Sequence, residues 1–166
     1  MKKALITLSA LSTLAFSSSA LAEPEYAAIA LQIDVEGSAS EVWSQVGEDY
    51  CSISDWLGVD CTISEGDGEI GTVRVLAGGR ITEIMVAKTP LSYGYTQPAV
   101  PGEFHNLYHG FMEARPIDAN NTQLRYTVML DVSNHADQAA KDEDLARRRA
   151  TFERALGNMK AMVEGE

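Results

Sequence analysis

Residues 122–133, TQLRYTVMLDVS, are followed closely by residues 137–164, DQAAKDEDLARRRATFERALGNMKAMVE, and the two stretches differ in hydrophobic period. In the first, every second residue is apolar, which predicts a strand with one buried face. In the second, apolar residues recur at helical spacing and form one stripe. The stripe contains Leu145, Phe152, Leu156, Met159 and Val163, and the opposite, solvated face is expected to carry Arg147, Arg148, Glu153 and Lys160. A helix over residues 137–164 would be about 42 Å long, enough to cross a whole sheet.

Before residue 122 the chain alternates short strand patterns with turn residues. Strands are expected over residues 59–65, 71–76, 80–88, 92–97 and 106–115. Glycine, proline or asparagine occurs in each turn, as in Gly66-Asp67-Gly68 and Gly78-Gly79, and such residues favour tight reversals of the chain. A meander of this kind predicts an antiparallel sheet with one covered face.

Two short helices are expected between a first strand and this meander. Residues 27–36 alternate apolar and polar side chains, which predicts the strand. Ser38 and Glu41 have capping-box spacing and open a helix that stops at Gly47. A second helix is expected over residues 53–57, ending at Gly58. The order of elements predicts an α+β fold forming one domain over residues 23–166.

The first 22 residues have the zones of a cleavable signal peptide. Lys2 and Lys3 form a basic start, residues 4–16 are mostly apolar, and Ala20-Leu21-Ala22 fits the small-x-small rule for signal peptidase. The apolar stretch is too short for a membrane anchor. We therefore expect export to the periplasm or the medium, with Glu23 as the new N-terminus.

The charge of the chain excludes some classes of partner. It has 13 basic and 24 acidic residues, a net charge of −11, and loss of Lys2 and Lys3 would make it more negative. Such a charge disfavours nucleic acids and anionic lipid surfaces. No later segment is long and apolar enough for stable membrane insertion. A monomer or weak dimer is expected.

Cys51 and Cys61 are the two cysteines of the chain. In an exported protein they are expected to form a disulfide, which would stabilise the fold by about 2–3 kcal/mol. Two separate buried thiols are the alternative. Two cysteines without suitably spaced histidines are too few for a structural zinc site, so no metal is expected.

Taken in order, several motifs resemble those of the START-like helix-grip (SRPBCC) superfamily. They are Ser40-Glu41-Val42-Trp43, Trp56, the hairpin Glu65-Gly66-x-Gly68-x-x-Gly71-Thr72-Val73-Arg74, Ile81-Thr82-Glu83, Tyr93-Gly94-Tyr95, Tyr108-x-Gly110 and the final helix. The superfamily includes polyketide cyclase/dehydrase-like proteins and, more distantly, the plant abscisic acid receptors. The resemblance implies a curved seven-stranded antiparallel sheet gripping the C-terminal helix, with two short helices after the first strand. It also implies an apolar cavity for lipids, hormones or polyketide-like molecules.

Strand alternation and the resemblance together select the residues that would line this cavity. The expected ligand-binding residues are Trp56, Arg74, Leu76, Ile81, Glu83, Tyr93, Tyr95, Tyr108, Gly110, Tyr126, Val128, Phe152, Leu156 and Met159. The tyrosines would provide apolar walls with polar tips; alternatively they fill the core or flank the sheet. Arg74 and Glu83 are expected to pair and to orient a ligand's polar end; the alternative is a surface salt bridge.

Three departures separate the chain from the hormone receptors. The Ala77-Gly78-Gly79 turn and the loop at residues 101–105 do not reproduce the receptors' gate and latch, and Val59 lies near the expected place of the ligand-anchoring lysine. Receptor function and an acidic ligand head are therefore not carried over.

The leading hypothesis is a binding or carrier protein for a small hydrophobic molecule, without a cofactor. The first alternative is a cyclase/dehydratase-type enzyme in which Glu83, Arg74 or His105 performs acid–base chemistry. The second is an interaction protein whose cavity is filled by its own side chains.

Overall fold

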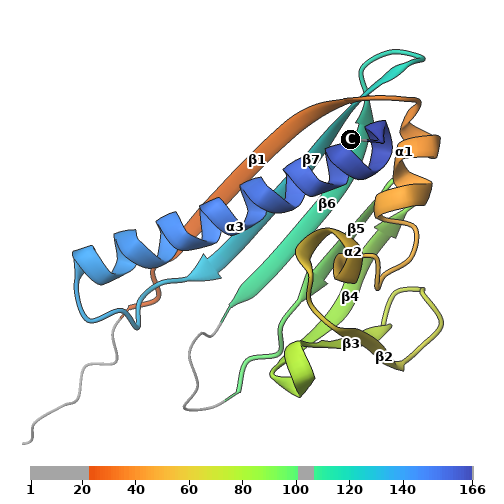
Figure 1. Ribbon diagram of the computed structural model, residues 1–166. Helices are drawn as coiled ribbons and strands as arrows, with labels where there is room; N and C mark the ends of the chain where they lie inside the picture. Colours follow the sequence, from red (N-terminus) through yellow and green to blue (C-terminus); the bar gives the residue numbers. More distant parts are fainter. Residues whose placement is uncertain (1–22, 101–106, 166) are drawn as a thin grey trace, which may run out of the picture.

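A computed structural model describes residues 23–100 and 107–165. Its core is one seven-stranded sheet in the order β1-β7-β6-β5-β4-β3-β2, with every neighbouring pair antiparallel (Figure 1). The strands are β1 Tyr26–Glu36, β2 Cys61–Glu65, β3 Val73–Leu76, β4 Ile81–Thr89, β5 Ser92–Thr96, β6 Tyr108–Pro116 and β7 Asn121–Asp131. The helices are α1 Ala39–Val46, α2 Ile53–Leu57, a 3-10 turn η1 Ala77–Gly79 and α3 Gln138–Glu164.

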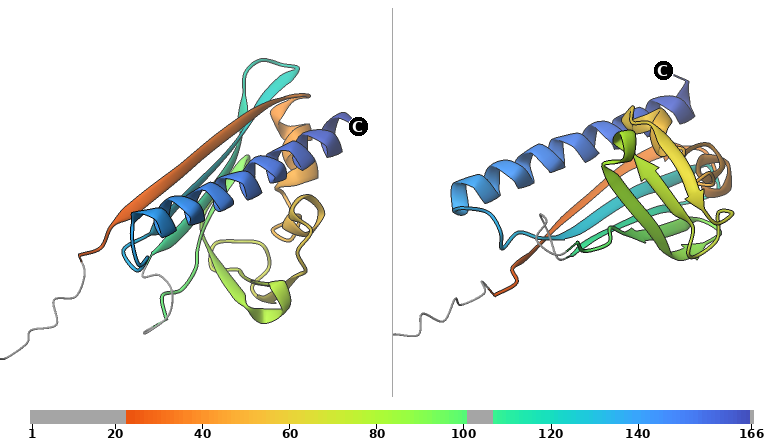
Figure 2. Two further views of the ribbon diagram at one scale, coloured as in Figure 1. Left: turned by 60° about the vertical axis from the view of Figure 1, so that its left-hand side comes forward. Right: turned by 90° about the horizontal axis from the view of Figure 1, so that it is seen from below.

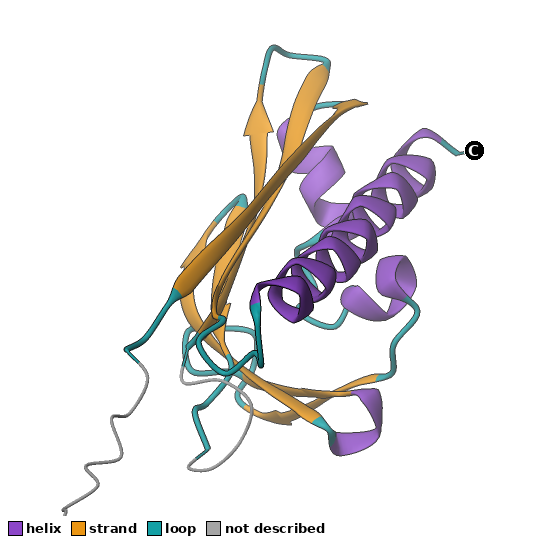
Figure 3. Ribbon diagram, turned by 90° about the vertical axis from the view of Figure 1, so that its left-hand side faces the viewer, coloured by secondary structure: helices purple, strands orange, loops and turns teal. Residues whose placement is uncertain are grey.

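The three α-helices lie on the same side of the curved sheet. Figure 3 shows the strands bending around α3, with α1 and α2 beside it. Figure 2 shows α3 running across the sheet from the β1–β7 edge. The α+β helix-grip fold and the two short helices after the first strand are therefore confirmed. In the described part of the chain, no helix is long and apolar enough to cross a membrane.

The helix boundaries follow the local sequence. Ser38 caps α1 with its side chain, and the side chain of Glu41 accepts a hydrogen bond from the backbone N–H of Ser38, so both halves of the predicted capping box are present. At the other end, a Cβ on Gly47 would lie 2.5 Å from the Trp43 ring, so only glycine fits there. Asp137 caps α3 by accepting a 2.9 Å hydrogen bond from the backbone N–H of Ala140.

Trp56 fixes α2 against the rest of the molecule. Its side chain is buried, and its indole N–H donates a 3.0 Å hydrogen bond to the carbonyl of Val46 at the end of α1. Its own carbonyl accepts a 2.9 Å hydrogen bond from the amide of Asn158 on α3. A five-residue helix has little stability of its own, so these tertiary contacts determine where α2 lies.

The predicted disulfide is confirmed. Cys51 and Cys61 are joined, with their Cα atoms 5.5 Å apart, and the bond ties the start of the α2 segment to the first residue of β2. Closing a short loop of this kind contributes about 2–3 kcal/mol by restricting the unfolded chain. The expected signal peptide, residues 1–22, lies outside the described residues.

Candidate functional site

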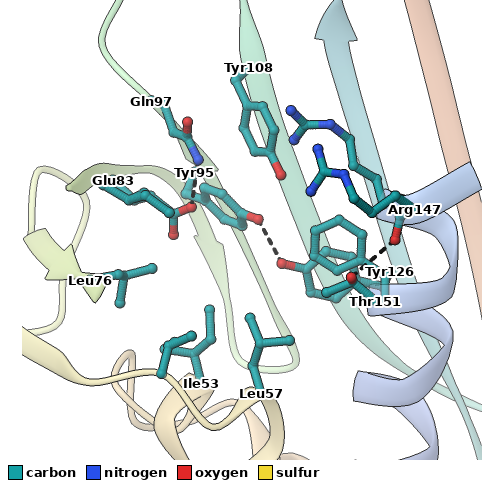
Figure 4. Close-up of a pocket in the computed structure, with 14 residues that line it drawn as sticks. Ile53, Leu57, Leu76, Glu83, Tyr95, Gln97, Tyr108, Tyr126, Arg147 and Thr151 are labelled. Carbon is teal, nitrogen blue, oxygen red and sulfur yellow. Dashed lines mark hydrogen bonds between the residues drawn. The ribbon is translucent and has the colours of Figure 1, made fainter. Parts of the chain in front are cut away.

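A pocket of about 170 Å³ lies between α2, strands β3–β7 and α3. It is the meeting point of the sheet, the long helix and the segment closed by the disulfide (Figure 4). Its lining residues are Ile53, Leu57, Val59, Leu76, Ile81, Glu83, Tyr95, Gln97, Tyr108, Tyr126, Arg147, Arg148, Thr151 and Phe152. The set combines an aliphatic part, an aromatic wall and a polar part.

The aliphatic part comes from α2, which lies inside the disulfide-closed loop, and from the β3–β4 hairpin. Ile53 and Leu57 project from α2 one helical turn apart, and Leu76 lies opposite them at the end of β3 (Figure 4). These side chains offer no hydrogen-bonding groups. This part of the pocket therefore suits the apolar body of a ligand.

Two tyrosine hydroxyl groups meet in the aromatic wall. The hydroxyls of Tyr95 on β5 and Tyr126 on β7 share a 2.6 Å hydrogen bond, and both side chains are buried (Figure 4). Gly110 on β6 makes this arrangement possible, because it is paired with Tyr95 across the sheet and the Tyr95 ring lies over it. A Cβ at Gly110 would be 2.1 Å from Cζ of Tyr95.

Burial keeps these phenols neutral. It raises the pKa values of Tyr95 and Tyr126 well above that of a free tyrosine, and it raises the pKa of Tyr108 to about 12. For Tyr108, the neighbouring positive charge of Arg148 opposes the effect of burial but does not overcome it. Near neutral pH the three side chains therefore present O–H groups that can donate hydrogen bonds, not phenolates that could act as bases.

Arg74 and Glu83 form a buried ion pair, as one of the two sequence interpretations proposed. They are direct cross-strand partners on β3 and β4, and Nη2 of Arg74 lies 2.6 Å from Oε2 of Glu83. Nε of Arg74 donates a further 2.8 Å hydrogen bond to the same oxygen, and Nη1 donates to the carbonyl of Tyr50. The guanidinium also lies 4.1 Å from the centroid of the Tyr50 ring, so aromatic faces share in its stabilisation.

The two partners of this ion pair differ in their relation to the pocket. Glu83 lines it and accepts a 3.1 Å hydrogen bond on Oε1 from the amide of Gln97, whereas Arg74 lies behind it. Burial alone lowers the pKa of Arg74, but Glu83 and the surrounding tyrosines outweigh this and raise it overall. Arg74 therefore stays charged and holds Glu83 in place.

Two arginines of α3 form the polar part of the lining. Nε of Arg148 lies 2.7 Å from Oδ2 of Asp144, and Nη2 of Arg147 pairs with the other oxygen of the same carboxylate. The Arg148 guanidinium lies 5.7 Å from the centroid of the Tyr108 ring. Arg148, only 17% exposed, corrects the sequence interpretation that placed it on the solvated face of the helix, whereas Arg147 is 67% exposed, as that interpretation expected.

The structure brings together half of the residues expected to bind a ligand. In the pocket lining are Leu76, Ile81, Glu83, Tyr95, Tyr108, Tyr126 and Phe152. Outside the lining are Trp56, Arg74, Tyr93, Gly110, Val128, Leu156 and Met159, of which all but Gly110 are fully or almost fully buried side chains of the interior. His105 lies outside the described residues.

Seven lining residues were not among those expected: Ile53, Leu57, Val59, Gln97, Arg147, Arg148 and Thr151. The i, i+4 spacing of Ile53 and Leu57 was a usable signal for one apolar side of α2. A second usable signal was the position of Arg148 four residues before Phe152 of the apolar stripe. Residues at this spacing share a helix face, so Arg148 could have been expected beside Phe152. No group of three or more metal-ligating side chains occurs in the parts of the chain that the structure describes.

Solved structures with the same fold include bacterial and plant proteins. The Zhui aromatase/cyclase of a Streptomyces species aligns with a TM-score of 0.69 at 18% identity, over 84% of this chain and 94% of its own. The XoxI protein of Bacillus cereus aligns with a TM-score of 0.67 at 19% identity, over 82% of this chain and 96% of its own. Truncated norcoclaurine synthase of Thalictrum flavum aligns with a TM-score of 0.61 at 13% identity, over 84% of this chain and 94% of its own. At these identities the likeness shows the fold alone.

Comparison of the sequence with protein families assigns the chain to a family, which the likeness in fold alone does not. No functionally curated protein matches the chain by sequence. The family described as "Polyketide cyclase / dehydrase and lipid transport" matches residues 26–164, which is nearly the whole of the described structure. The resemblance found in the motifs is thereby confirmed, and the chain belongs to the polyketide cyclase / dehydrase and lipid transport family of the helix-grip superfamily.

Proposed function

We propose that the protein binds a small, mainly apolar molecule in the pocket beneath α3. The observation that carries this proposal is a cavity of about 170 Å³ whose walls are aliphatic and aromatic and whose polar groups gather at one side. Interior space that side chains could fill is normally filled, because packing stabilises the fold. A cavity of this kind therefore favours binding over the alternative of an interaction protein with a filled interior.

The cavity volume limits the size of the ligand. Apolar cavities of about 150 Å³ are known to accept a benzene-sized molecule, so this pocket suits a body of one or two rings better than a long acyl chain. Burying roughly 200 Å² of apolar surface contributes about 5 kcal/mol before the costs of association. Micromolar affinity is the corresponding expectation.

Uptake of 2-naphthamide, a neutral two-ring probe, tests this proposal. Isothermal titration calorimetry should show saturable 1:1 binding to the wild-type protein. Ile81→Trp, which adds bulk inside the pocket, should weaken binding at least about tenfold, equivalent to losing about 1.4 kcal/mol. The matched control is Ile63→Trp on β2, because Ile63 is exposed and lies outside the lining. Absence of binding to wild type, or equal loss in both variants, would refute the pocket as the site.

A cyclase or dehydratase activity is the second candidate. It is favoured by the neutral Tyr95–Tyr126 hydroxyl pair and the Glu83 carboxylate, which line one cavity. The hydroxyls could donate to a carbonyl oxygen of the substrate, and the carboxylate could accept a proton from a neighbouring carbon. Arg74, behind the wall, would act by positioning Glu83.

Mass spectrometry separates the two candidates. A short poly-β-ketone analogue incubated with wild-type protein should lose water if the protein is an enzyme, and Tyr126→Phe and Glu83→Gln should slow that loss. Recovery of the unchanged analogue, from a protein that demonstrably binds 2-naphthamide, leaves binding as the function.

We also propose that the protein is exported after removal of residues 1–22. The basic start, the apolar stretch and the Ala20-Leu21-Ala22 site support this, and the Cys51–Cys61 disulfide is compatible with an oxidising compartment. N-terminal sequencing of protein from the extracytoplasmic fraction should begin at Glu23. A chain that still carries Lys2 and Lys3 would overturn the proposal.

A further inference from the structure

We propose that the protein has a second ligand site, separate from the pocket beneath α3, and that this site binds a small organic cation. The site is a crevice of about 380 Å³ between α1 and the β4–β5 hairpin, and we call it the α1 crevice. The residues that carry the argument are Trp43, Gly47 and Glu48 on the α1 side, and Met85, Lys88 and Tyr93 on the hairpin side. The proposal goes beyond the function proposed above, because that function requires only the pocket.

The α1 crevice and the pocket beneath α3 have no lining residue in common within the described part of the chain. Along β4, Glu83 lines the pocket and Met85 lines the crevice; along β5, Tyr95 lines the pocket and Tyr93 lines the crevice. Residues two apart on a strand project to the same side of a sheet, so both hollows lie on the inward face. They follow one another along the strands, and a molecule can occupy either one independently of the other.

Two aromatic rings form the inner wall of the α1 crevice. The ring centroids of Trp43 and Tyr93 lie 5.6 Å apart, and the ring planes are inclined by 55°. The negative face of an aromatic ring attracts cations, and tryptophan does so most strongly. The guanidinium of Arg74 already lies 5.6 Å from the centroid of Tyr93, so Trp43 is the ring that a ligand cation would use. The wall therefore suits a cation with an apolar body.

The charged side chains of the α1 crevice leave one negative charge without a partner. Lys88 is held by Glu69, whose Oε1 lies 2.8 Å from its Nζ, and it also donates a 2.6 Å hydrogen bond to the carbonyl of Gly68. Its charge is thus already matched. Glu48 is exposed, and among the residues that the structure describes none forms an ion pair or a side-chain hydrogen bond with its carboxylate. A ligand cation would provide the missing partner.

The end of α1 adds to this negative charge. The helix ends at Gly47 in the lining, and none of the residues in its last turn is basic. The partial negative charge of a helix C-terminus stabilises a nearby cation. The net charge of −11 also favours the approach of cations over anions. The carboxylate, the helix end and the Trp43 ring thus favour the same class of ligand, a protonated amine on a compact apolar body.

Two probes of the same shape test the preference for a cation. 2-Phenylethylamine is protonated near pH 7, whereas 2-phenylethanol is neutral. NMR titrations followed through the indole N–H signal of Trp43 should show about tenfold tighter binding of the amine. Glu48→Gln should remove most of this preference, whereas Lys88→Gln should increase it, because a like charge near the amine is lost. Glu65→Gln is the matched control, because Glu65 is exposed and lies outside the lining.

Blocking variants test the location of the site. Ser40 is exposed on α1 and lines the crevice, so Ser40→Trp should weaken amine binding at least about tenfold and leave 2-naphthamide binding unchanged. Ile81→Trp should do the reverse, because Ile81 lines the pocket beneath α3 and not the crevice. These two variants distinguish failure of the second site from failure of the function proposed for the pocket.

Four results would overturn the second site. They are an amine that does not bind, an alcohol that binds as tightly as the amine, a Glu65→Gln protein that loses as much of the preference as Glu48→Gln, and an Ile81→Trp protein that loses amine binding as Ser40→Trp does. The third result would mean that the net charge alone attracts the amine. The last would mean that the amine occupies the pocket beneath α3.

Discussion

Replacing Gly110 with alanine should displace the Tyr95 ring and break the hydroxyl pair in the pocket wall. The new Cβ would lie 2.1 Å from Cζ and 2.3 Å from the hydroxyl oxygen of Tyr95, far inside van der Waals contact. Forcing an extra methyl group into a packed interior costs about 1–3 kcal/mol. Loss of the buried Tyr95–Tyr126 hydrogen bond adds about 0.5–1.5 kcal/mol. The free energy of unfolding should therefore fall by roughly 2–4 kcal/mol.

Urea denaturation followed by tryptophan fluorescence measures this change. With a slope of about 2 kcal/mol per molar, the midpoint should fall by about 1–2 M. Gly157→Ala on α3 is the control, because its Cβ would meet nothing within 4 Å and should not destabilise the protein. Adding Tyr95→Leu to Gly110→Ala should restore part of the loss, since the clash is with the tyrosine ring. A Gly110→Ala protein as stable as wild type would refute the close packing of Tyr95 on β6.

Three further changes test the charges and the disulfide around the pocket. Glu83→Gln should lower the free energy of unfolding by about 3–5 kcal/mol in urea titrations, because it leaves the Arg74 guanidinium buried without its counter-charge; a loss below 1 kcal/mol would contradict the ion pair's structural role. Replacing Cys51 and Cys61 with alanine should cost about 2–3 kcal/mol and also weaken 2-naphthamide binding in calorimetry, and an unchanged affinity would show that the closed loop does not shape the pocket. The pKa of Asp144 is lowered in the folded state, where hydrogen bonds and charges of the two arginines outweigh burial. The contribution of the Asp144 carboxylate to the stability of the fold is thus fully present above about pH 4, and it is lost as the pH falls through the lowered pKa of Asp144. Asp144→Asn should consequently lose less stability than wild type between pH 6 and pH 3, and equal losses would refute this.

The sequence by itself determined the fold, because the relevant signals are local. Period-two alternation over residues 122–133 and the apolar stripe of residues 137–164 depend only on side-chain spacing, and the structure forms β7 and α3 there. Ser38 and Glu41 marked the start of α1 for the same reason. The cross-strand pairing of Arg74 with Glu83 followed from the short turn between their strands, although burial of the pair remained open until the structure placed it.

The tertiary structure alone decided which inward residues face the cavity and which fill the core. Tyr93 and Tyr95 are neighbours on β5 and both are buried, yet only Tyr95 lines the pocket. The Tyr93 ring instead packs against the rings of Trp43 and Tyr50, which are contacts between residues far apart in the sequence. Arg147 and Arg148 are a second case in which the sequence could not identify the residues of the pocket lining. Helical periodicity assigned both to solvent, which holds for Arg147 at 67% exposure. The long side chain of Arg148 instead reaches beyond the face on which it starts and lies in the pocket lining, paired with Asp144.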